Sequence, residues 1–186
     1  SSFTSYSLVL MVIHYLQCGV KQPVLPSLQN LYGSRFSRTA DVRSLNVSVP
    51  LSPPPQDKWT FNDSSTLGEL LIGFLEYYAN EFDFDKHAIS VRQGKKTDRV
   101  QVVKCRGGYS NSHAPQLNGS WRSQWRCICI EEPFTYSNTA HSVYDEMVFS
   151  EIKKAFSEAY KELESSRDLS RLLECKPIQV QIMGKC

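Results

Sequence analysis

An acidic pair followed by a proline and a polar turn is the part of the sequence best suited to hold a ligand. Glu131 and Glu132 come directly after the apolar residues 128–130 and directly before Pro133. An apolar strand that runs into such a turn places its last side chains at the edge of a cleft. A carboxylate only accepts hydrogen bonds, so a ligand at Glu132 would have to offer a donor such as an N–H group. An exposed acid at a strand end is the alternative interpretation.

A serine and a tyrosine stand at the head of the first expected helix. Apolar residues three and four positions apart predict this helix from Ser5 onward, with Gly19 ending it: Leu8, Met11, Val12, Tyr15 and Leu16. A helix N-terminus offers free N–H groups to an anion, and an aromatic face stacks on any base. These properties would allow contacts to a nucleotide, and the family resemblance given below assigns them to Ser5 and Tyr6. The alternative is a plain N-cap followed by a buried tyrosine.

Basic residues gather after the expected strand 88–92. Arg92, Lys95 and Lys96 come first, and further basic and aromatic residues follow: Arg99, Lys104, Arg106, Tyr109, Trp121 and Trp125. Such a mixture can track an RNA backbone and stack a base, whereas a solvated loop is the alternative. The formal net charge of +2 is too small to mark the whole chain as a nucleic-acid binder, so an RNA contact would be a local patch.

The sequence contains no set of residues that we expect to be catalytic or to bind a metal. Its one Asp-x-Asp pair, Asp83 and Asp85, follows a helix end without a Gly-Ser turn, and we interpret it as a solvated helix terminus. The histidines have no zinc-binding spacing: His14, His87, His113 and His141. Of these, His14 lies within the first helix and is expected in the core or at its rim. No Ser-His-Asp or Cys-His arrangement and no glycine-rich phosphate loop is visible.

Two further helices carry clear signals. Thr66 and Glu69 have the spacing of a capping box, and an apolar stripe follows: Leu67, Leu70, Leu71, Phe74, Leu75 and Tyr78. The last helix also has an apolar side: Val148, Phe149, Ile152, Phe156, Ala159, Tyr160 and Leu163. The segments 88–92 and 126–130 are expected to pair as a small antiparallel β-hairpin. The predicted fold class is therefore α+β and mostly α, a helical domain with one small hairpin.

The length of 186 residues suffices for one compact domain with a core. In chain order we expect a helical segment of a central domain, an extended loop, a second region with a loop insertion at 95–123, an amphipathic C-terminal helix and a tail: 1–32, 33–64, 65–140, 141–174 and 175–186. Six cysteines without CxxC spacing favour reduced thiols in the cytosol or nucleus. The apolar run 8–16 is about half as long as a membrane span, so no membrane contact is expected. The missing initiator methionine and the early helix indicate that the chain begins inside a longer protein.

Three stretches together resemble the helical and poly(A)-polymerase-associated (PAP-associated) part of the terminal nucleotidyltransferases: 5–17, 67–79 and 128–140. The resemblance is greatest to the cytoplasmic poly(A) RNA polymerases of the germline-development type and covers nearly the whole chain. It implies that the Ser5 hydroxyl touches a triphosphate, that the Tyr6 ring stacks on the base and that Glu132 faces the base edge. It also implies that Mg²⁺ or Mn²⁺ is held by an Asp-x-Asp pair on a palm domain outside this chain, so the chain alone is expected to be inactive.

The activity that this resemblance implies is the addition of AMP from ATP to RNA 3′ ends, in the cytoplasm or the nucleus. An RNA 3′ end and an RNA-binding recruiting protein are the implied partners. Family members that prefer UTP carry an extra histidine in the turn after the acid and proline, whereas residues 137–140 here are one residue shorter and lack it, and His141 lies later. This difference favours ATP. A terminal uridylyltransferase and a palm-less, inactive module that binds RNA or protein are the alternatives.

Overall fold

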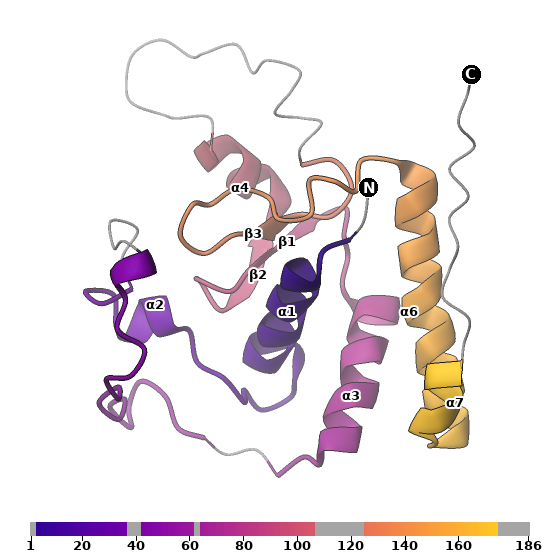
Figure 1. The fold of residues 1–186 in the computed structure, drawn as a ribbon, viewed down its shortest axis with the longest axis horizontal. Helices are drawn as coiled ribbons and strands as arrows, with labels where there is room; N and C mark the ends of the chain where they lie inside the picture. The colour runs from indigo at the N-terminus through magenta and orange to yellow at the C-terminus, as the bar shows by residue number, and fades with distance from the viewer. Residues whose placement is uncertain (1–2, 37–41, 62–63, 107–124, 175–186) are drawn as a thin grey trace.

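The computed structural model describes residues 3–36, 42–61, 64–106 and 125–174, and its helices surround a small sheet (Figure 1). The helices are α1 (Ser5–His14), α2 (Leu28–Leu31), α3 (Leu67–Glu76), α4 (Arg99–Arg106), α6 (Glu146–Ser166) and α7 (Leu169–Glu174). The strands are β1 (His87–Ser90), β2 (Lys95–Asp98) and β3 (Ile130–Glu131). The mostly helical α+β class is confirmed.

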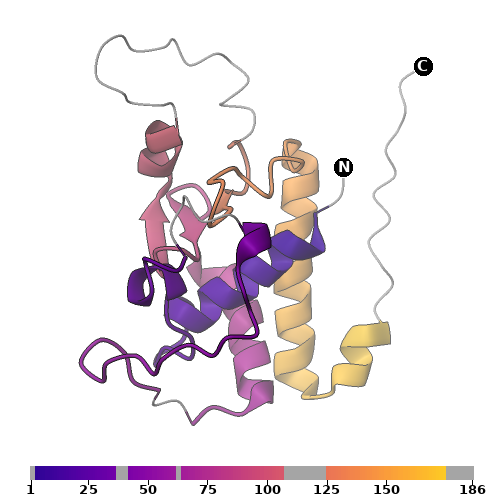
Figure 2. The same cartoon turned by 60° about the vertical axis from the view of Figure 1, so that its left-hand side comes forward.

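Helix α1 separates the sheet from a pair of helices. Figure 1 shows the strands and α4 on one side of α1, with α3 and α6 packed side by side on the other. In Figure 2, α1 runs obliquely across the direction of α6. Both α1 and α3 continue into a wider π-helical turn, Tyr15–Gly19 and Tyr77–Glu81. The start of α1 lies beside β3. The π-helical turn that continues α1 lies beside β2.

The sheet has the strand order β2-β1-β3, with β1 in the middle. Strands β1 and β2 form an antiparallel hairpin in which Ser90 pairs with Lys95, and Gly94 takes the positive φ of +64° that its turn needs. Strand β3 is parallel to β1, so the expected antiparallel pairing of 88–92 with 126–130 is wrong in direction. The reason is β2: it returns the chain to the end of the sheet where β1 begins, and a strand that enters from that end runs parallel to β1.

The segment expected to be a loop insertion, 95–123, begins with regular structure. Strand β2 and helix α4 occupy its first part, and residues 107–124, with Tyr109 and Trp121, lie outside the described residues. Only Thr97 is buried in β2, so an edge strand of Lys and Asp gave no alternating pattern. Asp98 begins α4 by accepting the N–H of Gln101 at 3.0 Å, a capping signal that the valines of α4, which favour strands, obscured.

The starts of α1 and α3 depend on threonine caps. At α3 the expected capping box is present: Thr66 Oγ1 accepts the Glu69 N–H at 3.2 Å, and the Glu69 carboxylate accepts the Thr66 N–H at 2.7 Å. At α1 the cap is Thr4, whose Oγ1 accepts the Ser7 N–H at 3.1 Å, and not Ser5. Ser5 is consequently the first residue inside the helix, with its side chain exposed.

The buried face of α1 differs from the expected apolar stripe. Met11 and Tyr15 are buried as expected, but Leu8 and Val12 are exposed to 41% and 38%. Ser7 and His14 take the buried positions instead, because both have hydrogen-bond partners across the core. The buried face of α1 is therefore the one that carries Ser7 and His14, and it does not coincide with the most apolar face of the helix.

The core is dominated by aromatic rings contributed by α1, α3, α6 and the segment after α3. Pairs such as Phe82 with Phe84, at 4.8 Å between centroids, and Phe74 with Tyr78, at 5.2 Å, meet edge to face. The expected apolar side of α6 packs against this cluster through all of its named members: Val148, Phe149, Ile152, Phe156, Ala159, Tyr160 and Leu163. A second, smaller cluster lies between α4 and the sheet: Ala88, Val102, Trp125 and Cys129.

The other expectations concern acids, thiols and membranes. Asp83 accepts the N–H groups of Asp85 and Lys86 and pairs with Lys86 Nζ at 3.0 Å, as expected of a solvated helix terminus. Cys18, Cys127 and Cys129 are free thiols, and burial raises the pKa of each. Among the described residues, no helix is both long and apolar enough to cross a bilayer.

His14 is a buried neutral histidine of the core. Its Nε2 lies 3.1 Å from the Tyr77 hydroxyl, and its ring meets Phe82 edge to face. Burial, helped by the charges of Lys96 and His87, lowers the pKa of His14 from 6.5 to about 3. Between about pH 6.5 and pH 3, therefore, His14 takes up a proton in the unfolded chain but stays neutral in the folded state.

Stability should decrease in acid because of this histidine. The folded pKa lies below the unfolded one, so the contribution of His14 is complete above about pH 6.5 and falls by up to about 1.4 kcal/mol per pH unit below it. Urea unfolding at about pH 7, 6 and 5 measures the slope of the unfolding free energy against pH. His14→Gln should flatten this slope whatever its effect on stability at neutral pH, and His141→Gln is the matched control. An equal slope in the wild type and in His14→Gln would contradict this account.

Candidate functional site

The structure brings together two of the predicted nucleotide contacts from opposite parts of the chain. Tyr6 lies in the first turn of α1 and Glu132 directly follows β3, and the Tyr6 hydroxyl donates a hydrogen bond to Glu132 Oε1 at 3.0 Å. Tyr6 is 48% exposed, so part of the residue is accessible to a ligand. Partial burial, the bond to Glu132 and the negative charge of that group raise the pKa of Tyr6 to about 12. The phenol is therefore neutral and remains a donor.

Glu132 is held by the turn that follows it. Its Oε2 accepts the N–H groups of Phe134, at 3.0 Å, and Thr135. Burial alone would raise the pKa of Glu132, but the bonds from Thr135, Tyr6 and Phe134 outweigh it and lower the pKa below its ordinary value. The carboxylate is therefore ionised and fixed in place, with Oε1 toward Tyr6 and Oε2 toward the backbone.

Ser5 lies at the same edge of the molecule as this pair. It is the residue before Tyr6, in the first turn of α1, and its side chain is exposed. The N–H groups of a first helical turn have no acceptor within the helix. Ser5 therefore lies next in the chain to the Tyr6–Glu132 pair, at the end of α1 where helix N–H groups lack intrahelical acceptors.

Asn138 anchors the turn, and sequence reasoning missed it. This side chain is 3% exposed; its Oδ1 accepts the N–H groups of Ile130 and Ala140 at 3.0 Å, and its Nδ2 donates to the Ile128 carbonyl at 2.8 Å. The next residue, Thr139, connects the turn to α1, because the Ser7 hydroxyl donates to the Thr139 carbonyl at 3.0 Å. An asparagine in a polar turn after a strand was the available signal.

Glu131 points the opposite way from Glu132 and is 2% exposed. Its Oε1 accepts bonds from the Ser90 hydroxyl at 3.0 Å and from Arg92 Nε at 2.9 Å. The Arg92 guanidinium also lies over the Tyr136 ring, 4.6 Å from its centroid. Arg92, a predicted RNA contact, is therefore engaged by protein groups. The alternation of side chains along a strand could have indicated that one acid of the pair lies inside.

The two remaining predicted RNA contacts border a basic cavity of about 270 Å³ next to this ion pair. Lys95 and Lys96 are exposed on β2, and Lys96 Nζ also lies 5.6 Å from the centre of the Tyr77 ring. The lining also includes Arg92, Tyr136 and two acids, Asp98 and Glu131. The other basic residues of the group differ. Arg99 donates to the carbonyls of Phe84 at 2.8 Å and Trp125 at 2.7 Å, which is a structural role, and the side chains of Lys104 and Arg106 lie outside the description.

The described residues contain no group of three or more His, Cys, Asp or Glu side chains that could hold a metal ion. His141, just after the turn 137–140, is occupied: its Nδ1 lies 2.8 Å from the Asn138 carbonyl. Within the described part of the chain, the surface therefore presents a partly exposed tyrosine and an ionised carboxylate, without a group of metal ligands.

Comparison with known proteins identifies the family to which the chain is similar. Residues 66–138 match the family model described as "Cid1 family poly A polymerase". The chain is 51% identical to poly(A) RNA polymerase gld-2 of Caenorhabditis elegans, over 96% of this chain and 19% of that protein. It is 36% identical to poly(A) RNA polymerase GLD2 of Homo sapiens, over 99% of this chain and 33% of that protein. The chain belongs to the GLD-2-type poly(A) polymerases, in their PAP-associated region.

The fold of this GLD-2-type region matches solved structures as well. The structure of a GLD-2/RNP-8 complex aligns with a TM-score of 0.70 and 52% identity, over 96% of this chain and 48% of that one. A structure of Cid1, a terminal uridylyl transferase, aligns with a TM-score of 0.64 at 24% identity, over 96% and 50% of the two chains, which shows the fold alone. The chain thus spans between a fifth and a third of the curated relatives above, and about half of these solved chains.

Asn138 should be a large single contributor to the stability of the candidate site. Asn138→Ala leaves the N–H groups of Ile130 and Ala140 and the Ile128 carbonyl without their buried partner, so we expect the free energy of unfolding to fall by about 2–4 kcal/mol. Chemical unfolding measures this loss. Ser137→Ala, at the exposed neighbouring position, is the control and should change stability by about 0.5 kcal/mol or less. A loss below about 1 kcal/mol in Asn138→Ala would contradict the anchoring role.

Proposed function

We propose that this chain forms the base-binding wall of an enzyme that adds AMP from ATP to RNA 3′ ends. The observation that carries the proposal is the bond between Tyr6 and Glu132, which joins the head of α1 to the turn after β3. Membership of the GLD-2-type family supports the reaction class. Because the chain spans only part of these relatives, the activity would belong to the longer protein.

Each group would have a separate task at the nucleotide. The open face of Tyr6 would stack on the base. Ser5 and the N–H groups of the first turn of α1 other than that of Ser7, which Thr4 caps, would hold phosphate oxygens. Glu132 would lie at the base edge, where an ionised carboxylate attracts the amino N–H of adenine. Since Glu132 already has three donors, Tyr6 would share Oε1 with the base.

Mg²⁺ or Mn²⁺ and the RNA 3′ end would meet this wall from other directions. The described residues do not fit a metal centre, so carboxylates elsewhere in the longer protein would hold the ions and neutralise the phosphates. The RNA would pass over Lys95 and Lys96, since Arg92 is paired with Glu131. A second protein would recruit the RNA, and the solved complexes of GLD-2 with RNP-8 and with GLD-3 support such a partner. The reaction would take place in the cytoplasm.

The Tyr6 ring should contribute more to nucleotide use than the Tyr6 hydroxyl does. In the complete enzyme, Tyr6→Ala should lower kcat/KM for ATP by about 1–3 kcal/mol in free-energy terms, the usual contribution of a stacked base. Tyr6→Phe keeps the ring and removes the bond to Glu132, so a smaller loss of about 0.5–1.5 kcal/mol is expected. Primer extension kinetics of the wild type and of both Tyr6 variants measure these losses. Tyr144→Ala, which changes an exposed tyrosine elsewhere in the chain, is the control. Equal losses in both Tyr6 variants would assign the role to the hydroxyl and contradict stacking.

Base preference tests the adenylyl assignment directly. The turn 137–140 lacks the extra histidine of UTP-selective relatives, so the complete enzyme should prefer ATP. Inserting a histidine between Ser137 and Asn138 should move the preference toward UTP by about 0.5–1.5 kcal/mol, the value of one added hydrogen bond. An alanine inserted at the same place is the matched control for the longer turn. Steady-state incorporation ratios on one primer measure the effect, and a wild-type preference for UTP would favour a terminal uridylyltransferase instead.

A further inference from the structure

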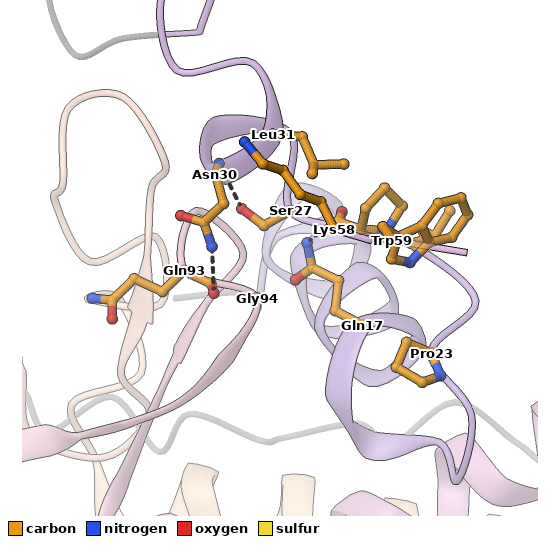
Figure 3. A pocket seen from close by; sticks show the side chains of 11 residues that line it. Gln17, Pro23, Ser27, Asn30, Leu31, Lys58, Trp59, Gln93 and Gly94 are labelled. Carbon is orange, nitrogen blue, oxygen red and sulfur yellow. Dashed lines mark hydrogen bonds between the residues drawn. The ribbon is translucent and has the colours of Figure 1, made fainter. Parts of the chain in front are cut away.

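A second cavity, of about 200 Å³, lies at the turn between β1 and β2, across Gln93 from the basic cavity described above (Figure 3). Its walls come from the end of α1, from α2 and the prolines before it, from the loop that contains Lys58 and Trp59, and from the hairpin turn at Gln93 and Gly94. Four separate parts of the chain thus converge on one space. None of the functional residues discussed above lines it, and it lies beyond the nucleotide site at the head of α1.

The walls of this cavity carry two polar atoms without a hydrogen-bond partner among the described residues. Gln17 is only 6% exposed; its Nε2 donates to the carbonyls of Pro26 at 3.1 Å and Val91 at 3.0 Å, whereas its Oε1 has no partner. Trp59 Nε1 is also buried and without a partner. A buried acceptor or donor that is not hydrogen bonded costs roughly 1–3 kcal/mol, so an occupant that reached either atom would remove a penalty of that size.

The two atoms define the chemistry of that occupant. Gln17 presents an acceptor and Trp59 a donor, and hydrogen-bonding edges of nucleobases carry both a donor and an acceptor. Drug-sized ligands fill about 300–1,000 Å³, so a cavity of 200 Å³ suits a fragment the size of one base. Lys58 adds a positive charge to the lining, which contains no Asp or Glu. This lining suits a group attached to a phosphate backbone.

The cavity also adjoins the basic cavity proposed above as an RNA contact. Gln93 lines both, and its carbonyl accepts a bond from Asn30 Nδ2 at 3.1 Å, which fixes the wall between them. A chain of nucleotides could therefore place its phosphates by Lys95 and Lys96 and one base across the hairpin turn. A folded peptide would have no such reason to extend from one cavity to the other.

We propose that the cavity bounded by Gln17, Lys58 and Trp59 binds one base of single-stranded RNA, at a position upstream of the reacting 3′ end. Gln17 Oε1 accepts a base N–H, Trp59 Nε1 donates to a ring nitrogen or carbonyl of the same base, and Lys58 attracts the adjoining phosphate. The inference rests on the proposed function, because it takes the RNA over Lys95 and Lys96. It adds a base-specific contact to a path otherwise governed by charge.

An abasic scan tests this. The 186-residue chain is titrated with a labelled oligoadenylate of about ten nucleotides, and with versions in which one base at a time is removed while every phosphate is kept. One abasic position should weaken binding by roughly tenfold, while the others change it little. Trp59→Phe keeps an aromatic ring but lacks the N–H, and it should remove this position dependence. Lys58→Ala should weaken binding of all the oligomers more than the control Lys21→Ala does.

The remaining outcomes separate this proposal from the proposed function. Binding that depends on Lys95 and Lys96 but shows no sensitive position would overturn the base site and leave the RNA contact standing. A sensitive position that persists unchanged in Trp59→Phe would place the base elsewhere and also overturn it. No binding of any oligomer would overturn both. Unfolding midpoints and circular dichroism of each variant confirm that Trp59→Phe and Lys58→Ala are folded when they are compared.

Discussion

The candidate site depends on one buried amide, the side chain of Asn138. Strand β3 is only two residues long, yet the turn after it must hold Glu132 within reach of Tyr6. Asn138 solves this by extending the strand with its own side chain: it bonds the N–H of Ile130 and the carbonyl of Ile128 as a neighbouring strand would. Unpaired backbone groups at these buried positions would be costly, so the turn has little freedom to open. The position of the Glu132 carboxylate thus depends on the hydrogen bonds that Asn138 makes to the backbone of residues 128 and 130.

The acid pair shows how one strand divides two tasks. Glu131 turns inward, where Ser90 and Arg92 bind it, and Glu132 turns outward to Tyr6. The inner acid fixes Arg92, and Arg92 in turn covers the ring of Tyr136, whose positive φ of 65° closes the turn around Glu132. The two carboxylates are chemically alike, and only their side of the strand assigns one to structure and the other to the surface. The Tyr6–Glu132 pair and the basic cavity consequently share one support, the two acids at the end of β3.

Local signals in the sequence were sufficient for the helices but not for the sheet. The capping box at Thr66 and the apolar side of α6 are set by neighbours three and four residues away, so their prediction is confirmed. The direction of β3 depends on β2, whose charged residues carry no strand pattern, and only the fold reveals it. The pairing of Tyr6 with Glu132 spans 126 residues, and no spacing rule foretells it. The identity of the two residues came from family resemblance, whereas their contact and the role of Asn138 came from tertiary structure.

The position of Lys95 and Lys96 has a consequence for association between molecules. Strand β2 is one of the two outer strands of the described sheet, and outer strands can pair with a strand of another molecule and start aggregation. Exposed lysines at such an edge repel a second copy, because two like-charged edges would have to meet. The two charges proposed to attract RNA would then also keep the protein monomeric. A neutral residue at either position would then have two effects: weaker attraction for RNA, and a weaker barrier to pairing between the β2 edges of two molecules.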